Sequence, residues 1–121
     1  MKLRIHGNSL RFRLTRKEVA SLVEHGHVEA ELRFAPDQAL RYAVYSTPAA
    51  ESTSVDYSPA GVRILLPLRC VQAWAASDQV SIEDFGKVHL LVEKDFQCLH
   101  GPERRDPDAF ANPLAEQHQE A

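Results

Sequence analysis

Hydrophobic and polar residues alternate at the start of the chain. Leu3 and Ile5 alternate with polar neighbours over residues 2–6, and the alternation returns over residues 10–14. A period of two is typical of a strand with one buried face. The segment HGNS lies between the two stretches, and its glycine and asparagine both suit a turn. The pattern therefore predicts a β-hairpin over residues 2–14.

A helix is predicted directly after this hairpin. Thr15 and Glu18 have the spacing of a capping box, in which each side chain accepts a hydrogen bond from the backbone N–H of the other residue. An apolar stripe with helical spacing begins at Val19, and Gly26 suits the position after the last turn. The segments HVEAELRF and LRYAVY then alternate again and predict a second hairpin. Its buried face would hold Val28, Ala30, Leu32, Phe34, Leu40, Tyr42 and Val44.

The same order of patterns returns in the second half of the chain. SVDYSP and VRILL read as strands, PLRCVQAWAAS as a helix, and QVSIED and KVHLLVEK as strands, after the polar linker STPAAESTS. The two halves align without a gap from Leu3 to Ala30 at a constant offset of 52 residues, which places Arg11 on Arg63 and Val19 on Val71. We interpret this as an internal duplication. The alternative is that two amphipathic units of one type resemble each other for physical reasons.

These elements predict an α+β fold that is mostly β. Two duplicated ββαββ units would form an antiparallel, barrel-like sheet with two short helices, because closure removes exposed sheet edges. A two-layer α+β sandwich is the alternative architecture. The prediction is a single domain over residues 1–98, with halves at about 1–46 and 53–98. Residues 99–121 have no period and hold three of the seven prolines, so an irregular tail is predicted there, with disorder as the alternative.

Composition places the chain among soluble globular proteins, with 44% hydrophobic and 26% charged residues among 121. It has no apolar run of spanning length and no signal-peptide pattern, so we expect a cytoplasmic protein without a membrane partner. The net charge of −3 is uneven: residues 1–50 carry +3 and residues 51–121 carry −6. No nucleotide-binding loop, nucleophile elbow or HExxH helix is present, and no cofactor is expected.

The second half resembles a known topology. VRILLP, LRCVQAWAA, SDQV and SIEDFGKVHLLV follow one another as in the swapped-hairpin unit of the AbrB-type transition regulators and antitoxins. That resemblance implies exchanged hairpins and DNA binding through basic residues, although only Arg63 and Arg69 precede or enter the second helix here. The whole chain, from MKLRIHGNSLRFRLT through WAASD to LLVEKDFQCL, also resembles a group of small uncharacterised bacterial proteins. That resemblance implies a bacterial, single-domain protein and supplies no activity.

Arginines on alternating strand positions are the main candidates for chemistry. They are Arg4, Arg11, Arg13, Arg33 and Arg41. If the strands that carry them are neighbours, several guanidiniums share a sheet face, and arginine forks suit phosphate oxygens. The segment EAELR also resembles the Glu-x-Glu-x-Lys strand of triphosphate tunnel enzymes, with arginine in place of lysine. The structural alternative is a solvated sheet face with cross-strand ion pairs.

Cys98 and His100 form a second candidate, two residues apart at the end of the last strand. A closed structural zinc site needs about four ligands, and no second pair of ligands has the spacing to complete one. We therefore do not favour a metal site. The function favoured by the sequence is a small non-catalytic binding domain whose partner is a protein or a small anion. The alternatives are an AbrB-like DNA-binding regulator, with nucleic acid as a less favoured partner, and a triphosphate-processing enzyme.

Overall fold

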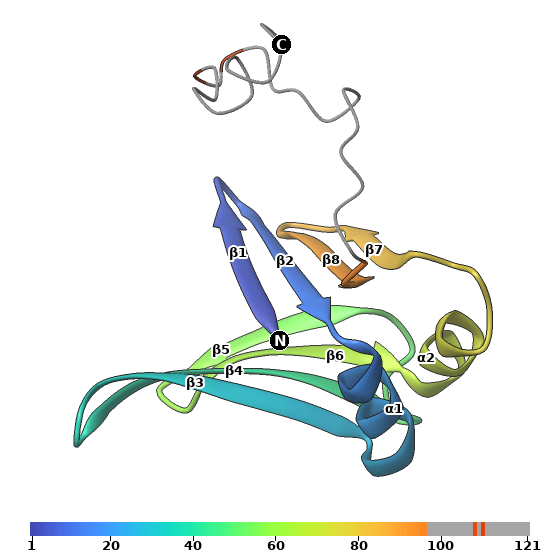
Figure 1. Cartoon of the computed structure of the whole chain (residues 1–121), viewed down its shortest axis with the longest axis horizontal. Coiled ribbons are helices and arrows are strands. Elements are labelled where there is room, and N and C mark those ends of the chain that lie inside the picture. The colour runs from blue at the N-terminus through green and yellow to red at the C-terminus, as the bar shows by residue number, and fades with distance from the viewer. Residues whose placement is uncertain (97–107, 109, 111–121) are drawn as a thin grey trace, which may run out of the picture.

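The computed structural model describes residues 1–96 together with Asp108 and Phe110 (Figure 1). Eight strands and two helices occur in this part of the chain, and the order ββαββ appears twice along it. The elements are β1 (Lys2–His6), β2 (Ser9–Leu14), α1 (Arg16–His25), β3 (His27–Ala35), β4 (Gln38–Thr47), β5 (Ser54–Ser58), β6 (Gly61–Pro67), α2 (Leu68–Ala75), β7 (Ser81–Phe85) and β8 (His89–Lys94). Neither helix is long and apolar enough to cross a membrane.

The strands form two four-stranded sheets. The β1 sheet has the order β1-β2-β8-β7, and the β3 sheet has the order β3-β4-β6-β5. Each sheet therefore takes one hairpin from the first half of the chain and one from the second. Within each hairpin the strands are antiparallel, but the central pairs β2–β8 and β4–β6 are parallel.

Two parts of the predicted architecture are wrong. Neither four-stranded sheet closes on itself, so the closed or nearly closed barrel is not formed. The sheets are also not purely antiparallel, because a parallel pair joins the two hairpins in each of them. The alternation of residues defines the two faces of a strand, but it carries no information on which distant strand lies beside it. The mostly β composition with two helices is confirmed.

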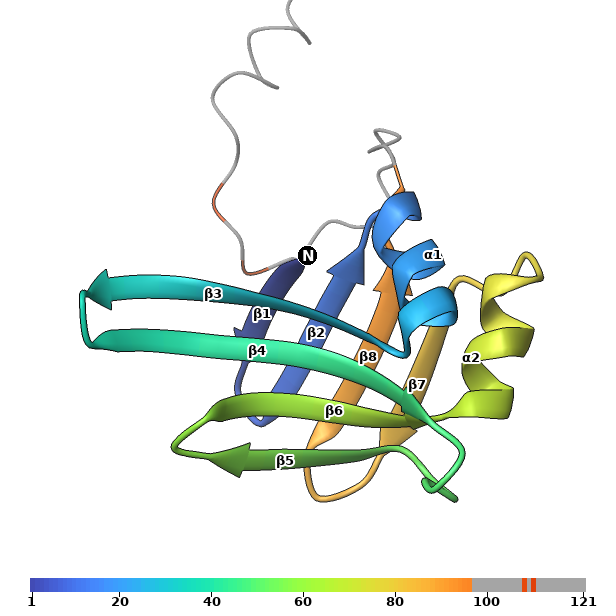
Figure 2. The same ribbon diagram turned by 90° about the horizontal axis from the view of Figure 1, so that it is seen from below.

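The core lies between the two sheets and is closed at one end by the two helices (Figures 1 and 2). Phe12 and Val92 of the β1 sheet and Val44 and Ile64 of the β3 sheet belong to one buried cluster with Trp74 of α2. The strands of the two sheets cross at a steep angle in Figure 2. Neither α1 nor α2 covers the outward face of either sheet (Figures 1 and 2).

The second predicted hairpin is only partly buried. Val44 is fully buried, but Leu32 is 52% exposed and Phe34 is 69% exposed. Figure 1 shows why: β3 and β4 extend well past the β1 sheet on the side away from the helices. The register of β3 with β4 also shifts between Arg33 and Ala35, so the strict alternation predicted through Phe34 is interrupted there. Nothing in the sequence gives the length over which the facing sheet covers this hairpin.

Helix α1 begins with the predicted capping box. Thr15 Oγ1 accepts a hydrogen bond from the Glu18 N–H, and Glu18 Oε1 accepts one from the Thr15 N–H. The N-terminal ammonium of Met1 donates to the other carboxylate oxygen of Glu18. Partial burial raises the pKa of Glu18, but the Met1 ammonium and the Thr15 hydrogen bonds outweigh it, so the pKa lies below its ordinary value.

We expect Glu18→Gln to remove a pH-dependent part of the stability. A carboxyl with a lowered folded pKa stabilises the fold above its unfolded pKa, and this contribution is lost as the pH falls through the folded value. Above about pH 6 the variant should be less stable than the wild type, by about 0.5–1 kcal/mol. Urea unfolding between pH 7 and pH 3 should show the two curves converging in acid. Curves that stay parallel over this range would show that the Glu18 charge does not contribute.

Candidate anion-binding site

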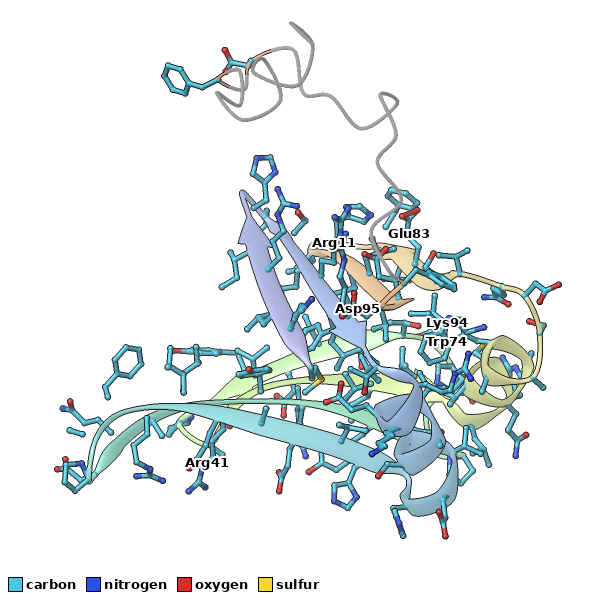
Figure 3. The ribbon with its side chains drawn as sticks, in the orientation of Figure 1. Arg11, Arg41, Trp74, Glu83, Lys94 and Asp95 are labelled. Atoms are coloured by element: carbon cyan, nitrogen blue, oxygen red, sulfur yellow. The ribbon has the colours of Figure 1, made fainter. Side chains whose placement is uncertain are left out.

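The structure divides the five candidate arginines between the two sheets. Arg4 lies on β1 and Arg11 and Arg13 lie on β2, whereas Arg33 and Arg41 lie on β3 and β4. Figure 3 shows Arg11 on the side of the β1 sheet that faces away from the β3 sheet, and Arg41 pointing away from the opposite side of the molecule. The five guanidiniums therefore do not share one surface, and the two groups are considered separately.

The arginines of the β3 sheet are neutralised by acidic neighbours. Glu31 accepts a hydrogen bond from Arg33 at 2.9 Å and lies 3.4 Å from Arg41 Nε. The hydrogen bond from Arg33, then its charge, hold the pKa of Glu31 below its ordinary value. The other nitrogen of the Arg33 fork donates to the Pro36 carbonyl. A hollow of about 330 Å³ lies beside these arginines, and Asp37 lines it. This is the solvated face with ion pairs that the sequence offered as the alternative.

The EAELR segment does not line a tunnel. It lies on β3, where Glu29, Glu31 and Arg33 are all exposed, and the β3 sheet is open. Its resemblance to the triphosphate tunnel enzymes does not extend to a closed, charge-lined barrel in the described part of the chain.

The outward face of the β1 sheet is different, because basic side chains gather on it. Residues that are register partners point to the same face of a sheet, so the strand register defines three rows across β1, β2, β8 and β7. From the helical end toward the turns the rows are Lys2, Arg13, Glu93, Ser81; then Arg4, Arg11, Leu91, Glu83; then His6, Ser9, His89, Phe85. We call this surface the basic face.

Arg4 and Arg11 are directly opposite each other on this face. Like charges in that position destabilise a strand pair, so such a pair without a counterion is costly. Arg11 Nε lies 3.6 Å from a Glu93 oxygen, but the same oxygen lies 2.6 Å from Arg13 Nε and is bound more closely there. Arg4 has no ion pair with any residue in the described part of the chain. The middle row therefore has an excess of positive charge.

Both arginines line a small open-sided hollow. Its volume is about 140 Å³, and its lining residues are Arg4, His6, Ser9, Leu10, Arg11, His89 and Leu91. Two guanidiniums, two imidazoles and a hydroxyl thus converge on a space of this size. Arg4, His6 and Arg11 can donate hydrogen bonds here, and arginine donates two in a geometry that matches two oxygens of an oxyanion. The Ser9 hydroxyl already donates to the His6 carbonyl at 2.7 Å, and His89 Nε2 is buried 3.3 Å from a Glu83 oxygen.

The turns at this end of the sheet are tied together. Asn8, in the β1–β2 turn, donates from its side chain to the Lys87 carbonyl, and its own carbonyl accepts from the His89 N–H. These two bonds fix the β7–β8 turn against the β1–β2 turn. The hollow is consequently built from segments that are about 80 residues apart in the chain yet held in one geometry.

Sequence reasoning identified Arg4 and Arg11 but missed His6, Ser9 and His89. His6 could have been found from the sequence. Alternate residues of a strand point to the same face, so His6 lies on the same face as Lys2 and Arg4. His89 could not be found in this way, because it joins the site only through the parallel pairing of β2 with β8.

A larger hollow of about 580 Å³ lies at the helical end, and residues of α1, β8 and the segment after α2 line it. Two of its charged side chains have partners: Lys94 donates to the Ser77 carbonyl, and Asp95 lies 3.1 Å from Lys2 Nζ. Its other two charged side chains, Arg16 and Asp78, are of opposite sign, so this hollow has no excess of positive charge. Within the described residues, no three histidine, cysteine or acidic side chains gather as they would around a metal ion. Cys98 and His100 lie outside the described residues.

A protein-family model matches residues 1–114 of the chain, and it describes a family of unknown function, DUF7009. The chain belongs to this family. No curated protein and no solved structure matches it. Membership of DUF7009 agrees with the resemblance to an uncharacterised group and brings no activity with it.

Proposed function

We propose that this protein is a non-catalytic binding domain whose ligand is a small oxyanion, with phosphate as the model compound, held between Arg4 and Arg11. The observation that carries the proposal is the opposed arginine pair on the basic face, which no carboxylate of residues 1–96 balances on the Arg4 side. A bound oxyanion would supply the missing counterion and would accept bidentate hydrogen bonds from both forks.

Comparison of the two halves supports a dedicated role for this pair. We infer that the halves arose by duplication, because β1 and β5, β2 and β6, and α1 and α2 each start 52 residues apart. At that offset Arg4 corresponds to Asp56 and Arg11 to Arg63. Asp56 is directly opposite Arg63 and lies 2.8 Å from its Nε. The second half thus has a neutral ion pair where the first half has two positive charges.

The Arg4→Asp variant copies the second half into the first and tests the proposal. Tripolyphosphate or inorganic phosphate at a hundred times its Kd should stabilise the wild type by about 2.7 kcal/mol. This is a rise in Tm on the order of 8 °C for a domain of this size. Arg4→Asp should remove the rise. Its ligand-free Tm should not fall, because an opposite-charge pair replaces a repulsive one and is worth about 0.2–1 kcal/mol.

Arg33→Asp is the matched control, since it makes the same change in net charge on the other sheet. It should keep the phosphate-induced rise in Tm while losing its ion pair with Glu31. If Arg33→Asp and Arg4→Asp weaken the effect equally, only the overall charge matters and the site is not the one proposed. Absence of any phosphate effect in the wild type at low salt would also overturn the proposal.

A second candidate, an AbrB-like DNA-binding regulator, is supported by the pairing of the hairpins. In each sheet a hairpin of one half lies beside a hairpin of the other, which is the exchange that the AbrB resemblance implies. The basic face would then contact phosphates of a duplex. For duplex DNA, log K falls with log salt by about 0.9 per phosphate neutralised. This candidate would be favoured over a small-anion site by two results together. The duplex would bind more tightly than tripolyphosphate, and the slope of log K against log salt would correspond to about four neutralised phosphates.

A further inference from the structure

We propose that two copies of this chain bind each other through the inner face of the β3 sheet, at the end that extends past the β1 sheet (Figure 1). This inference goes beyond the proposed anion site and rests on different residues. It starts from apolar side chains that point inward and yet are not covered by the core.

The strand register identifies the residues of this surface. Val44 and Ile64 are register partners in the buried core, so they define the inner face of the β3 sheet. Two residues along each strand, away from the helices, the same face has its next row, and two more residues give a third row. The six residues of these rows are Ala30, Tyr42, Val62 and Tyr57, then Leu32 and Leu40, and we call them the apolar wall.

Much of the apolar wall is exposed. Within it Tyr57 is 82% exposed and Leu32 is 52% exposed. On the facing side of the β1 sheet, Ile5 is 64% exposed, although its register partner Leu10 packs against the core. Figure 1 shows the cause: the two sheets diverge from the core toward the β1–β2 turn, and β3 and β4 continue beyond it. The side chains of residues 1–96 therefore leave an apolar surface uncovered between the sheets.

The length of the β3–β4 hairpin indicates a role outside the core. Its strands have 9 and 10 residues, whereas the hairpin that the second half contributes to the β1 sheet, β7–β8, has strands of 5 and 6 residues. The additional length carries Leu32, Leu40 and, at the register shift near the tip, Phe34, which is 69% exposed. Monomeric proteins rarely expose a contiguous apolar patch larger than roughly a few hundred Å². A surface of this kind indicates a protein partner.

The available area is sufficient for a dimer. The four most exposed of these side chains, two aromatic and two aliphatic, offer roughly 400–500 Å² of surface per copy. Two copies would thus bury on the order of 1,000 Å² from these side chains alone, which is close to the lower limit for a specific interface. The half-buried residues of the apolar wall add to this area. Two tyrosines and no charged residue are also typical of the centre of an interface.

The chemistry of the apolar wall favours a second copy as the partner. In a twofold dimer each copy presents the same patch, and a patch without charges is complementary to itself because no like charges meet across the axis. Two sheet faces pack about 10 Å apart, as in β-sandwiches. The charged residues of β3 and β4 occupy the alternate positions, so they stay in water on the other face. The apolar wall has no basic side chain that would attract a nucleic acid or an anionic membrane.

The oligomeric state of the full chain tests this inference. Analytical ultracentrifugation at micromolar concentration should give the wild type a mass of twice 13.6 kDa. Tyr57→Asp places one carboxylate from each copy in the interface, and burial of an unpaired charge is costly. We expect the dissociation constant of the dimer to rise at least about a hundredfold, which gives a monomer under the same conditions. Leu32→Asp should have the same effect.

Phe85→Asp is the matched control. Phe85 and Tyr57 are both aromatic residues of edge strands, and they are 78% and 82% exposed. Phe85 lies on the outward face of the β1 sheet, in the row of His89, so its replacement should leave the dimer intact. Circular dichroism shows that each variant is folded, and we expect the wild-type spectrum from all three because the replaced side chains are exposed in one copy.

Three results would overturn the inference. The first is a wild type that sediments as a monomer up to about 1 mM. The second is a dimer that survives both Tyr57→Asp and Leu32→Asp, since it would use another surface. The third is a monomer in which Tyr57 and Leu32 bind a different protein. None of these results bears on the anion site, because Arg4 and Arg11 lie on the other face of the β1 sheet.

Discussion

Replacing Trp74 with alanine is expected to lower the free energy of unfolding by about 3–5 kcal/mol. The indole is fully buried in the cluster that both sheets and both helices share. Its Nε1 donates a hydrogen bond of 3.1 Å to the Val80 carbonyl, which anchors the segment between α2 and β7. The alanine variant loses both the packing of the ring and this hydrogen bond, so urea unfolding should show a large decrease in the midpoint.

Trp74→Phe separates the two contributions. The phenyl ring keeps most of the apolar contact and loses the indole hydrogen bond, while the Val80 carbonyl still accepts from the Lys94 N–H at 3.0 Å. We therefore expect a loss of about 0.5–1.5 kcal/mol. If Trp74→Ala itself lowers the free energy of unfolding by less than about 1 kcal/mol, α2 is not packed into the core as described.

Replacing Gly61 with alanine is expected to destabilise the fold by about 2–4 kcal/mol. Gly61 has φ of 128°, a region that other residues rarely adopt, and a Cβ there would lie 2.2 Å from the Arg41 carbonyl oxygen. The clash is with backbone, so no side chain can rotate to relieve it. Arg41 lies on β4 and Gly61 begins β6, and the clash therefore exists only if these two strands are neighbours.

Gly7→Ala is the matched control. Gly7 also has a positive φ, of 54°, but nothing lies within 4 Å of a Cβ at that position. We expect a loss of about 1 kcal/mol from the backbone conformation alone. Thermal unfolding of both variants measures the difference, and equal losses would argue against the close approach of β4 and β6.

The local elements could be predicted from the sequence because their causes are local. Alternation defined the strands, the Thr15–Glu18 spacing gave the start of α1, and Gly26 gave its end, where it adopts a left-handed φ of 82°. Each of these signals depends on residues within a few positions of one another. The polar face predicted for the first hairpin was also correct, since Arg4, Arg11 and Arg13 all lie on the outward face of their strands.

The arrangement of the strands could not be predicted in the same way. The parallel pairs β2–β8 and β4–β6 join segments from different halves, and a period-two pattern is satisfied by any neighbour that covers the apolar face. This is why the barrel was predicted in place of two open sheets. It is also why the arginines were grouped as one set, and why His89 was not recognised as a residue that lines the hollow beside Arg11.

The position of bound phosphate tests the central claim most directly. An amide ¹H–¹⁵N spectrum of the protein, titrated with inorganic phosphate at low salt, reports which residues sense the ligand. We predict saturating shifts at Arg4, His6, Ser9, Arg11 and His89, and none beyond the general effect of salt at Arg33 and Arg41. Shifts that gather at Arg33 and Arg41, or that change linearly with salt at every arginine, would contradict an anion site between β1 and β2.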